Sequence, residues 1–174
     1  MTKKEQAMEA FPSMIPISSA EEIPRDQYVV YLLFYDEEPI VVGHGKYSRA
    51  RVIFDDRETI TPSHIKALFV RIYHLFGGQG NFDRLLLPCA SKQEASKLER
   101  EIHASIGGNT RALPEELTAA VFEGIEEGSV AEMVLKIALS SSFDGLSDLK
   151  RWKRHGIVGE EIWSVIANKL ALQW

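Results

Sequence analysis

The chain has 174 residues, 45% of them hydrophobic and 26% charged, a balance that fits one domain with a real core or a compact domain with a helical addition. The formal net charge of −5 excludes a broad electrostatic attraction to nucleic acid, so any DNA contact has to come from a local basic patch. A single cysteine, Cys89, excludes an internal disulfide and any zinc site built from several cysteines.

The first 25 residues mix charges, prolines and small polar residues without clear periodicity, which predicts an extended, partly ordered arm. This segment lacks the continuous apolar run of a signal peptide. No stretch of the chain approaches the roughly 20 apolar residues that are needed to span a bilayer. We therefore expect a cytoplasmic protein that does not contact a membrane.

A β-hairpin is predicted next. Residues 28–35, YVVYLLFY, are rich in β-branched and aromatic side chains. Residues 36–39 have the composition of a turn, and a second apolar run, IVVG, follows at 40–43. The two runs are short enough to pair as neighbouring antiparallel strands.

Two helical patterns and a third strand follow the hairpin. Residues 46–55 repeat apolar side chains at helical spacing, and so do the residues from Pro62 to Phe76, which precede a glycine-rich turn. Residues 82–90, FDRLLLPCA, have the composition of a third strand.

A further helix is expected from Ser91 to Ile106. Ser91 and Glu94 match the capping box that begins a helix, and Gly107 is a typical residue after a helix end. The apolar stripe of this helix consists of Ala95, Leu98, Ile102 and Ile106.

Glu99 projects within this apolar stripe. A carboxylate in such a position is costly unless it is paired, protonated or bound to a metal. It is either half of a buried salt bridge, a side chain at the edge of the stripe that reaches solvent, or a functional ligand. His64, His74 and His103 show no metal-ligand spacing with one another and are interpreted as solvated or helix-surface side chains.

From Pro114 onward only helices are expected, with breaks near Gly128, residues 140–143 and Gly156. We place a domain boundary near residue 113. The stripe of the last helix has to pack on the core domain or on a second copy, and the latter would make a homodimer through the C-terminal helices. Its members are Trp163, Ile166 and Leu170.

A basic run in this tail surrounds Trp152. Such a run can follow a DNA backbone while its aromatic residue stacks on a base, or it can be a solvated helix face anchored by one buried tryptophan. Its candidate nucleic-acid contacts are Lys150, Arg151, Lys153 and Arg154.

The ordered set of strand, strand, arginine helix, strand and glutamate helix resembles the GIY-YIG nuclease family. Tyr31 matches the tyrosine of the family's Gly-Ile-Tyr, and Gly43 matches the glycine of its Tyr-Ile-Gly. Arg51 stands eight residues after that glycine, as in the family. Glu99 corresponds to the metal-binding glutamate, and Asn109 to the asparagine that often closes the site.

The resemblance covers residues 26–112 and implies an α+β fold, a small three-stranded antiparallel sheet flanked by helices. The expected organisation is therefore an N-terminal arm at 1–25, a GIY-YIG-like nuclease domain at 26–112 and an all-helical C-terminal extension at 113–174.

The chain departs from the family pattern at three positions. Val29 replaces the first glycine, which removes backbone freedom but no reactive group. Val41 replaces the second tyrosine and loses a hydroxyl that would help to order the attacking water. Asp55 stands where many members have a histidine.

His44, Lys46 or Tyr47 can supply a replacement polar group just past the glycine. Lys46 is attractive because a cation near the scissile phosphate lowers the pKa of a neighbouring phenol. The alternative is a solvated lysine at a helix start.

The resemblance implies a metal-dependent endonuclease that hydrolyses DNA phosphodiester bonds. One divalent cation, Mg²⁺ or Mn²⁺, would sit on Glu99 and a phosphate oxygen, and a single carboxylate would be a poor site for zinc. Tyr31 would act as general base, deprotonated or relaying a proton, and Arg51 would neutralise charge on the phosphate. Lys46 and Arg51 are the expected DNA contacts near the site.

Two other interpretations stay open. One is a catalytically inactive domain of the same fold that binds DNA or another protein. The other is a helical interaction protein in which the match of the hairpin is accidental.

Overall fold

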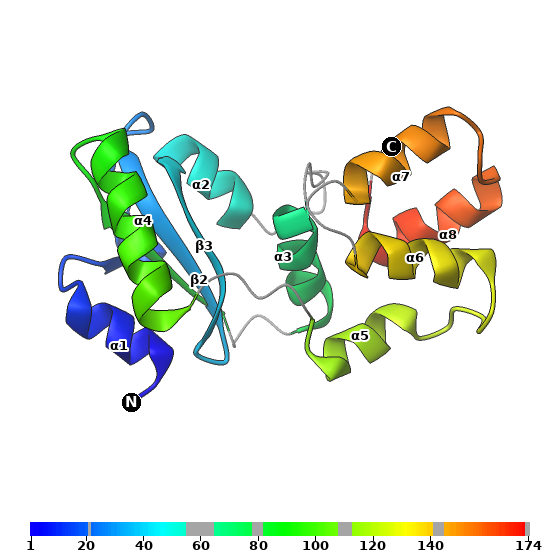
Figure 1. Cartoon of the computed structure of the whole chain (residues 1–174), viewed down its shortest axis with the longest axis horizontal. Coiled ribbons are helices and arrows are strands. Elements are labelled where there is room, and N and C mark those ends of the chain that lie inside the picture. The colour runs from blue at the N-terminus through cyan, green and yellow to red at the C-terminus, as the bar shows by residue number, and fades with distance from the viewer. Residues whose placement is uncertain (21, 55–64, 78–81, 108–112, 141–144, 173–174) are drawn as a thin grey trace. The chain divides into compact units, whose positions relative to one another are not determined.

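The structure is a computed structural model. It describes the chain at 1–20, 22–54, 65–77, 82–107, 113–140 and 145–172, and within these ranges it leaves the side chains of 51–54, 65–67, 69 and 145–147 undescribed. The described parts contain eight α-helices and one four-stranded antiparallel sheet, which confirms the α+β class (Figure 1). No helix in these ranges is long and apolar enough to cross a membrane.

The chain folds into two compact units. The sheet unit consists of residues 1–55 and 78–111, and the helical unit consists of residues 56–77 and 112–174. The chain passes from the sheet unit to the helical unit for the last time between residues 111 and 112. The segment at 56–77, which we expected inside the nuclease-like domain, belongs to the helical unit, because its helix contributes to the helical core.

The three expected strands are β2 (Tyr28–Tyr35), β3 (Glu38–Lys46) and β4 (Phe82–Pro88). A fourth strand, β1 (Ile15–Pro16), pairs with β4, so the expectation of three strands is corrected to four. The strand order β1-β4-β2-β3 puts β2 in the interior of the sheet and β3 at an edge.

The hairpin between β2 and β3 has the expected turn. Asp36 and Glu37 both have positive φ, at 48° and 66°, as the two central residues of a tight primed turn require. The register places Tyr31 opposite Gly43, with Val30 opposite His44. Since directly opposed residues share a face of the sheet, Tyr31 and His44 point to opposite faces.

One face of the sheet packs against α4 (Lys92–Ile106), which contacts β2 and β3. The core on this face joins apolar residues of three strands to the stripe of α4 and includes Val30, Leu32, Phe34, Val42, Leu85, Leu87, Ala95 and Ile102. Helix α2 (Tyr47–Phe54) also contacts β2 and β3, and Figure 1 draws α2 and α4 on different sides of these strands.

Helix α4 has the boundaries that the sequence predicts. The Ser91 hydroxyl accepts a hydrogen bond from the Glu94 amide at 3.1 Å, and the Glu94 carboxylate accepts one from the Ala90 amide at 2.7 Å. Gly107 ends the helix with a φ of 81°, which favours glycine.

The N-terminal segment is not the extended arm that we expected. It forms α1 (Lys3–Ala10), β1 and a short 3₁₀-helix, η1 (Ile17–Ser19). Helix α1 begins with a capping box in which Thr2 and Glu5 each accept the other's amide hydrogen. Ala7 is buried in the sheet core, and Lys4 pairs with Asp83 of β4 at 2.9 Å.

The helical unit comprises α3 (Ile65–Phe76), α5 (Glu115–Phe122), α6 (Val130–Ser140), α7 (Gly145–Arg154) and α8 (Glu160–Leu170). The expected breaks near Gly128 and Gly156 are present, and residues 141–144 lie outside the described part. The stripe of α8 is buried in this unit's own core together with residues such as Ile72, Leu135 and Leu149. It therefore packs within the chain itself.

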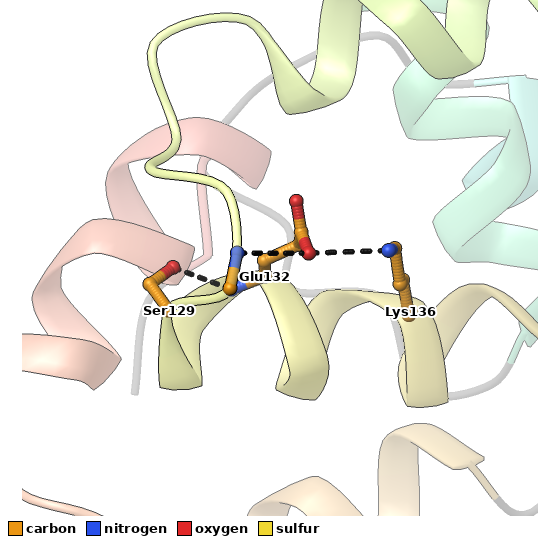
Figure 2. A network of polar contacts seen from close by, with 4 residues as sticks. Ser129, Glu132 and Lys136 are labelled. Carbon is orange, nitrogen blue, oxygen red and sulfur yellow. Dashed lines mark hydrogen bonds and ion pairs between the residues drawn. The ribbon is translucent and has the colours of Figure 1, made fainter.

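A polar network at the start of α6 is a helix cap (Figure 2). The Ser129 hydroxyl accepts a hydrogen bond from the Glu132 amide at 3.2 Å. The Glu132 carboxylate accepts one from the Gly128 amide and another from the Lys136 ammonium, at 3.3 and 3.1 Å. The bond from Lys136, followed by that from Gly128, lowers the pKa of Glu132.

Candidate active site

The site centres on Glu99, in the middle of α4. Its side chain is 19% exposed, and its two oxygens contact two different imidazoles. Oε2 contacts Nδ1 of His44, and Oε1 lies 3.4 Å from Nε2 of His103. Of the alternatives that the sequence leaves open for Glu99, the structure shows a paired carboxylate, and its partners are histidines.

Strand and helix periodicity bring these three side chains together. His44 stands opposite Val30 on the face of the sheet that packs against α4. His103 follows Glu99 by one helical turn, so both project from the same side of α4. The interpretation of His103 as a solvated or helix-surface side chain leaves out this contact, although its spacing of four residues from Glu99 is a signal for it.

Tyr31 lies across Gly43. A Cβ atom at Gly43 would be 2.5 Å from the Tyr31 hydroxyl oxygen and 2.6 Å from its Cζ, so only glycine leaves room for the ring. The tyrosine and the glycine on which the resemblance rests therefore form one cross-strand pair. Tyr31 itself is buried, with 6% of its surface exposed.

Tyr31 and Glu99 do not share a face of the sheet. Tyr31 and Gly43 occupy one face, whereas His44 and Glu99 occupy the other, and the edge strand β3 lies between the two groups. The Glu99 carboxylate nevertheless acts on the pKa of Tyr31. Burial raises the pKa of Tyr31 most, the positive charge of Arg49 opposes this rise, and the Glu99 carboxylate adds to it. A substrate phosphate would therefore have to lie across the β3 edge to meet both groups.

Helix α2 carries the two arginines nearest to this edge in sequence. Arg51, the expected charge-neutralising residue, lies on α2, and its side chain is outside the described part of the chain. Arg49 is exposed and acts on the pKa of Tyr31, and its Cδ would lie 3.8 Å from a Cβ atom at Gly45. Arg49 was not predicted as a site residue, because the family's spacing of eight residues after Gly43 selects Arg51.

The remaining candidates lie at the end of β3, on α7 or outside the described residues. Lys46 is exposed at the end of β3, and Asn109 and Asp55 fall outside the described residues. The basic run lies on α7 in the helical unit, where Arg151 pairs with Asp148 at 2.8 Å and Trp152 is partly buried against the core. The other members of this run are Lys150, Lys153 and Arg154.

The donor chemistry around Glu99 fits a divalent cation that keeps most of its coordination positions for water or substrate. Among the residues whose placement is described, no group of three or more histidine, cysteine, aspartate or glutamate side chains is arranged to hold a metal ion. One carboxylate with an adjacent imidazole instead offers a mixed oxygen and nitrogen donor set.

A cavity of about 290 Å³ lies elsewhere in the sheet unit, and neither Tyr31 nor Glu99 lines it. Its walls come from α1, the segment around η1 and β4, and include Lys4, Met8, Ser18, Phe82 and Arg84. It therefore does not belong to the candidate active site.

Comparison of the chain with protein-family models, with curated proteins and with solved structures finds no match.

Proposed function

We propose that the sheet unit is a metal-dependent endonuclease that hydrolyses DNA phosphodiester bonds. The observation that carries this proposal is the half-buried Glu99 carboxylate in the middle of α4, held against His44 at the edge strand and electrostatically coupled to Tyr31. A carboxylate in the middle of a helix cannot cap it. Binding of a metal ion for hydrolysis would explain why a carboxylate stands at this position.

The order of the elements supports the proposal. Strand β2 carries Tyr31, its neighbour β3 carries Gly43, α2 carries Arg51, and α4 follows β4 and carries Glu99. This is the order in which the GIY-YIG resemblance expects a tyrosine, a glycine, an arginine and a metal-binding glutamate.

The proposed hydrolysis requires three functions of the site. Attack by water on phosphorus forms one P–O bond and breaks another, so the site has to accept a proton from the water, neutralise the phosphate and orient the attack. Glu99 would hold the divalent cation, which supplies a positive charge against the phosphate oxygens. An α2 arginine, Arg51 or Arg49, would supply the second positive charge with its forked guanidinium.

Tyr31 serves this reaction as a neutral phenol. Because burial and Glu99 raise its pKa, the hydroxyl keeps its proton near pH 7. It would therefore orient the attacking water and relay that water's proton to solvent, from which the leaving oxygen would regain one, and it would not act as a resident phenolate. The resemblance implies that Tyr31 is either deprotonated or a proton relay, and the raised pKa favours the relay.

A second candidate function is an inactive domain of the same fold that binds DNA or protein. It is favoured by Val41, which lacks the hydroxyl of the family's second tyrosine, and by the pairing of Glu99 with two histidines. In this case the cluster around Glu99 is purely a structural ion pair.

A plasmid-nicking assay in Mg²⁺ and in Mn²⁺ tests the choice, with circular dichroism as a check of folding. We expect Glu99→Gln and Arg51→Ala to lower the rate by about 100-fold or more, the usual effect of removing a group that stabilises transition-state charge. Glu132→Gln is the matched control, because Glu132 also has a partner one turn further along its helix but only caps α6.

Equal nicking by wild type and Glu99→Gln would refute the nuclease proposal and indicate a contaminant or another site. A folded wild-type protein that binds DNA but does not nick it in either metal would support the inactive domain.

A further inference from the structure

His44 is the side chain that meets Glu99 from a different element of the fold. Its Nδ1 contacts Oε2 of Glu99, and the strand register fixes the residue next to Gly43 at the sheet edge. We propose that His44 Nδ1 is a second protein ligand of the cation that Glu99 binds, so that the site prefers a first-row transition ion such as Mn²⁺ to Mg²⁺. This inference rests on the proposed function, because it concerns the metal of the same site.

Ligand geometry supports a shared ion. Ions of this size hold their ligands at about 2.1 Å, so neighbouring ligand atoms in an octahedral shell lie about 3 Å apart. Two donor atoms from a strand and a helix that already touch need only a small side-chain rotation to separate by that distance and admit an ion. Two protein ligands also leave about four of six positions for water and phosphate oxygens, as a phosphodiester substrate needs.

The donor types decide the preference between metals. Mg²⁺ takes oxygen ligands and keeps its waters, whereas imidazole nitrogen binds transition ions well. A site with Glu99 alone would accept Mg²⁺ and Mn²⁺ with little distinction. The addition of a nitrogen donor shifts the balance toward Mn²⁺.

His103 is the matched control for this proposal. It also contacts Glu99, but through the other oxygen at 3.4 Å, from the same helix and with a side chain that is 32% exposed. Because His103 contacts the Glu99 oxygen that does not face His44, its removal should weaken Mn²⁺ binding by at most about fivefold. Comparison of the His44 and His103 variants thus distinguishes a histidine that binds the metal from one that only contacts Glu99.

The test is Mn²⁺ binding to the whole chain, followed by electron paramagnetic resonance with and without a short DNA duplex. We expect His44→Ala to weaken Mn²⁺ binding by more than about tenfold and Mg²⁺ binding by much less. Electron spin echo modulation should report an imidazole nitrogen bound to Mn²⁺ in wild type and in His103→Ala. The nitrogen signal should vanish in His44→Ala and in His44→Gln, two variants whose folding is checked by circular dichroism.

A nitrogen signal that persists without His44, or one that is absent from wild type under both conditions, overturns the proposal. The nicking assay keeps this failure distinct from failure of the nuclease. If Glu99→Gln abolishes nicking while Mn²⁺ shows no bound nitrogen, the nuclease stands and His44 is not a ligand. If Glu99→Gln nicks as wild type does, the proposed function fails, and with it the shared active-site metal.

Discussion

The helical unit and the sheet unit each contain a helical glutamate with a partner one turn further along the chain. Glu132 stands at the start of α6, and its contacts with the Gly128 amide and Lys136 account fully for its position (Figure 2). Glu99 stands in the middle of α4, where the backbone amides are already paired within the helix. Helix capping therefore explains the position of Glu132 and does not explain that of Glu99.

The cores of the two units differ in the polarity of the residues that surround them. The helical core is an apolar cluster around Trp163, and the sheet core ends beside the polar group of His44, Glu99 and His103. Substitutions in the helical core should therefore affect stability most. Substitutions around Gly43 and Tyr31 should have smaller effects on stability that are specific to the site.

The largest expected effect is that of Trp163→Ala. Trp163 is 1% exposed, and its indole nitrogen donates a hydrogen bond to the Val158 carbonyl at 3.0 Å. The cavity left by alanine should lower the free energy of unfolding of the helical unit by about 3–5 kcal/mol. Hydrogen exchange by mass spectrometry should show lost protection in α6 and α8. Val165→Ala, on the same helix but 43% exposed, should change stability by less than about 0.5 kcal/mol.

The same experiment tests whether the two units unfold independently. Because each unit has its own core, peptides from β2 and β4 should keep their protection in Trp163→Ala. An equal loss of protection in these strands would mean that the two cores unfold together.

Gly43→Ala should have the next largest effect. Its Cβ would overlap the Tyr31 ring, so the strand pair has to shift, and we expect a loss of about 1–3 kcal/mol in the free energy of unfolding. Gly45→Ala is the matched control on the same strand, because its Cβ would meet only the Arg49 Cδ at an ordinary 3.8 Å. Chemical denaturation of both variants measures the difference.

The double variant Gly43→Ala/Tyr31→Leu identifies the cause. If the Tyr31 ring is what excludes a Cβ at position 43, shortening that side chain should cancel most of the penalty of Gly43→Ala in a double-mutant cycle. Additive losses would show that the glycine is needed for some other reason.

Local patterns in the sequence were sufficient for the elements that carry the site. The hairpin follows from two β-rich runs and a polar turn, and the limits of α4 follow from Ser91 and Gly107. Helix α1 was missed because its apolar periodicity is weak, although Thr2 and Glu5 have the spacing of a capping box. In that case the signal was present and was overlooked.

The packing between elements far apart in the chain could not be predicted from the sequence. Nothing within α3 indicates that it joins the helical core, since its apolar stripe would suit either unit. The contact between His44 and Glu99 depends on the register of one strand and the position of α4 over it. Both are decided by residues far apart in the chain, so the sequence places Glu99 in an apolar stripe but does not identify His44 as its partner.

The smallest expected effect is on the titration of Tyr31, and it links the two faces of the sheet. Its pKa is raised in the folded protein above the unfolded value of about 10. The folded state therefore keeps this proton longer than the unfolded state does. The resulting contribution to stability is fully present below about pH 10 and is lost as pH rises through the folded pKa. Wild type should lose more stability than Tyr31→Phe over this range.

The two charges that act on Tyr31 make the titration a test of the site. Near-ultraviolet absorbance of tyrosinate, with Tyr31→Phe as the reference, gives the pKa of this residue in each variant. Arg49→Ala should raise this pKa and Glu99→Gln should lower it, because they remove opposite charges. If Glu99→Gln leaves the titration of Tyr31 unchanged, the phenol and the carboxylate are not coupled across β3. A phosphate at the β3 edge could then not use both groups, and the role of Tyr31 in the proposed hydrolysis would be lost even if Glu99 binds metal.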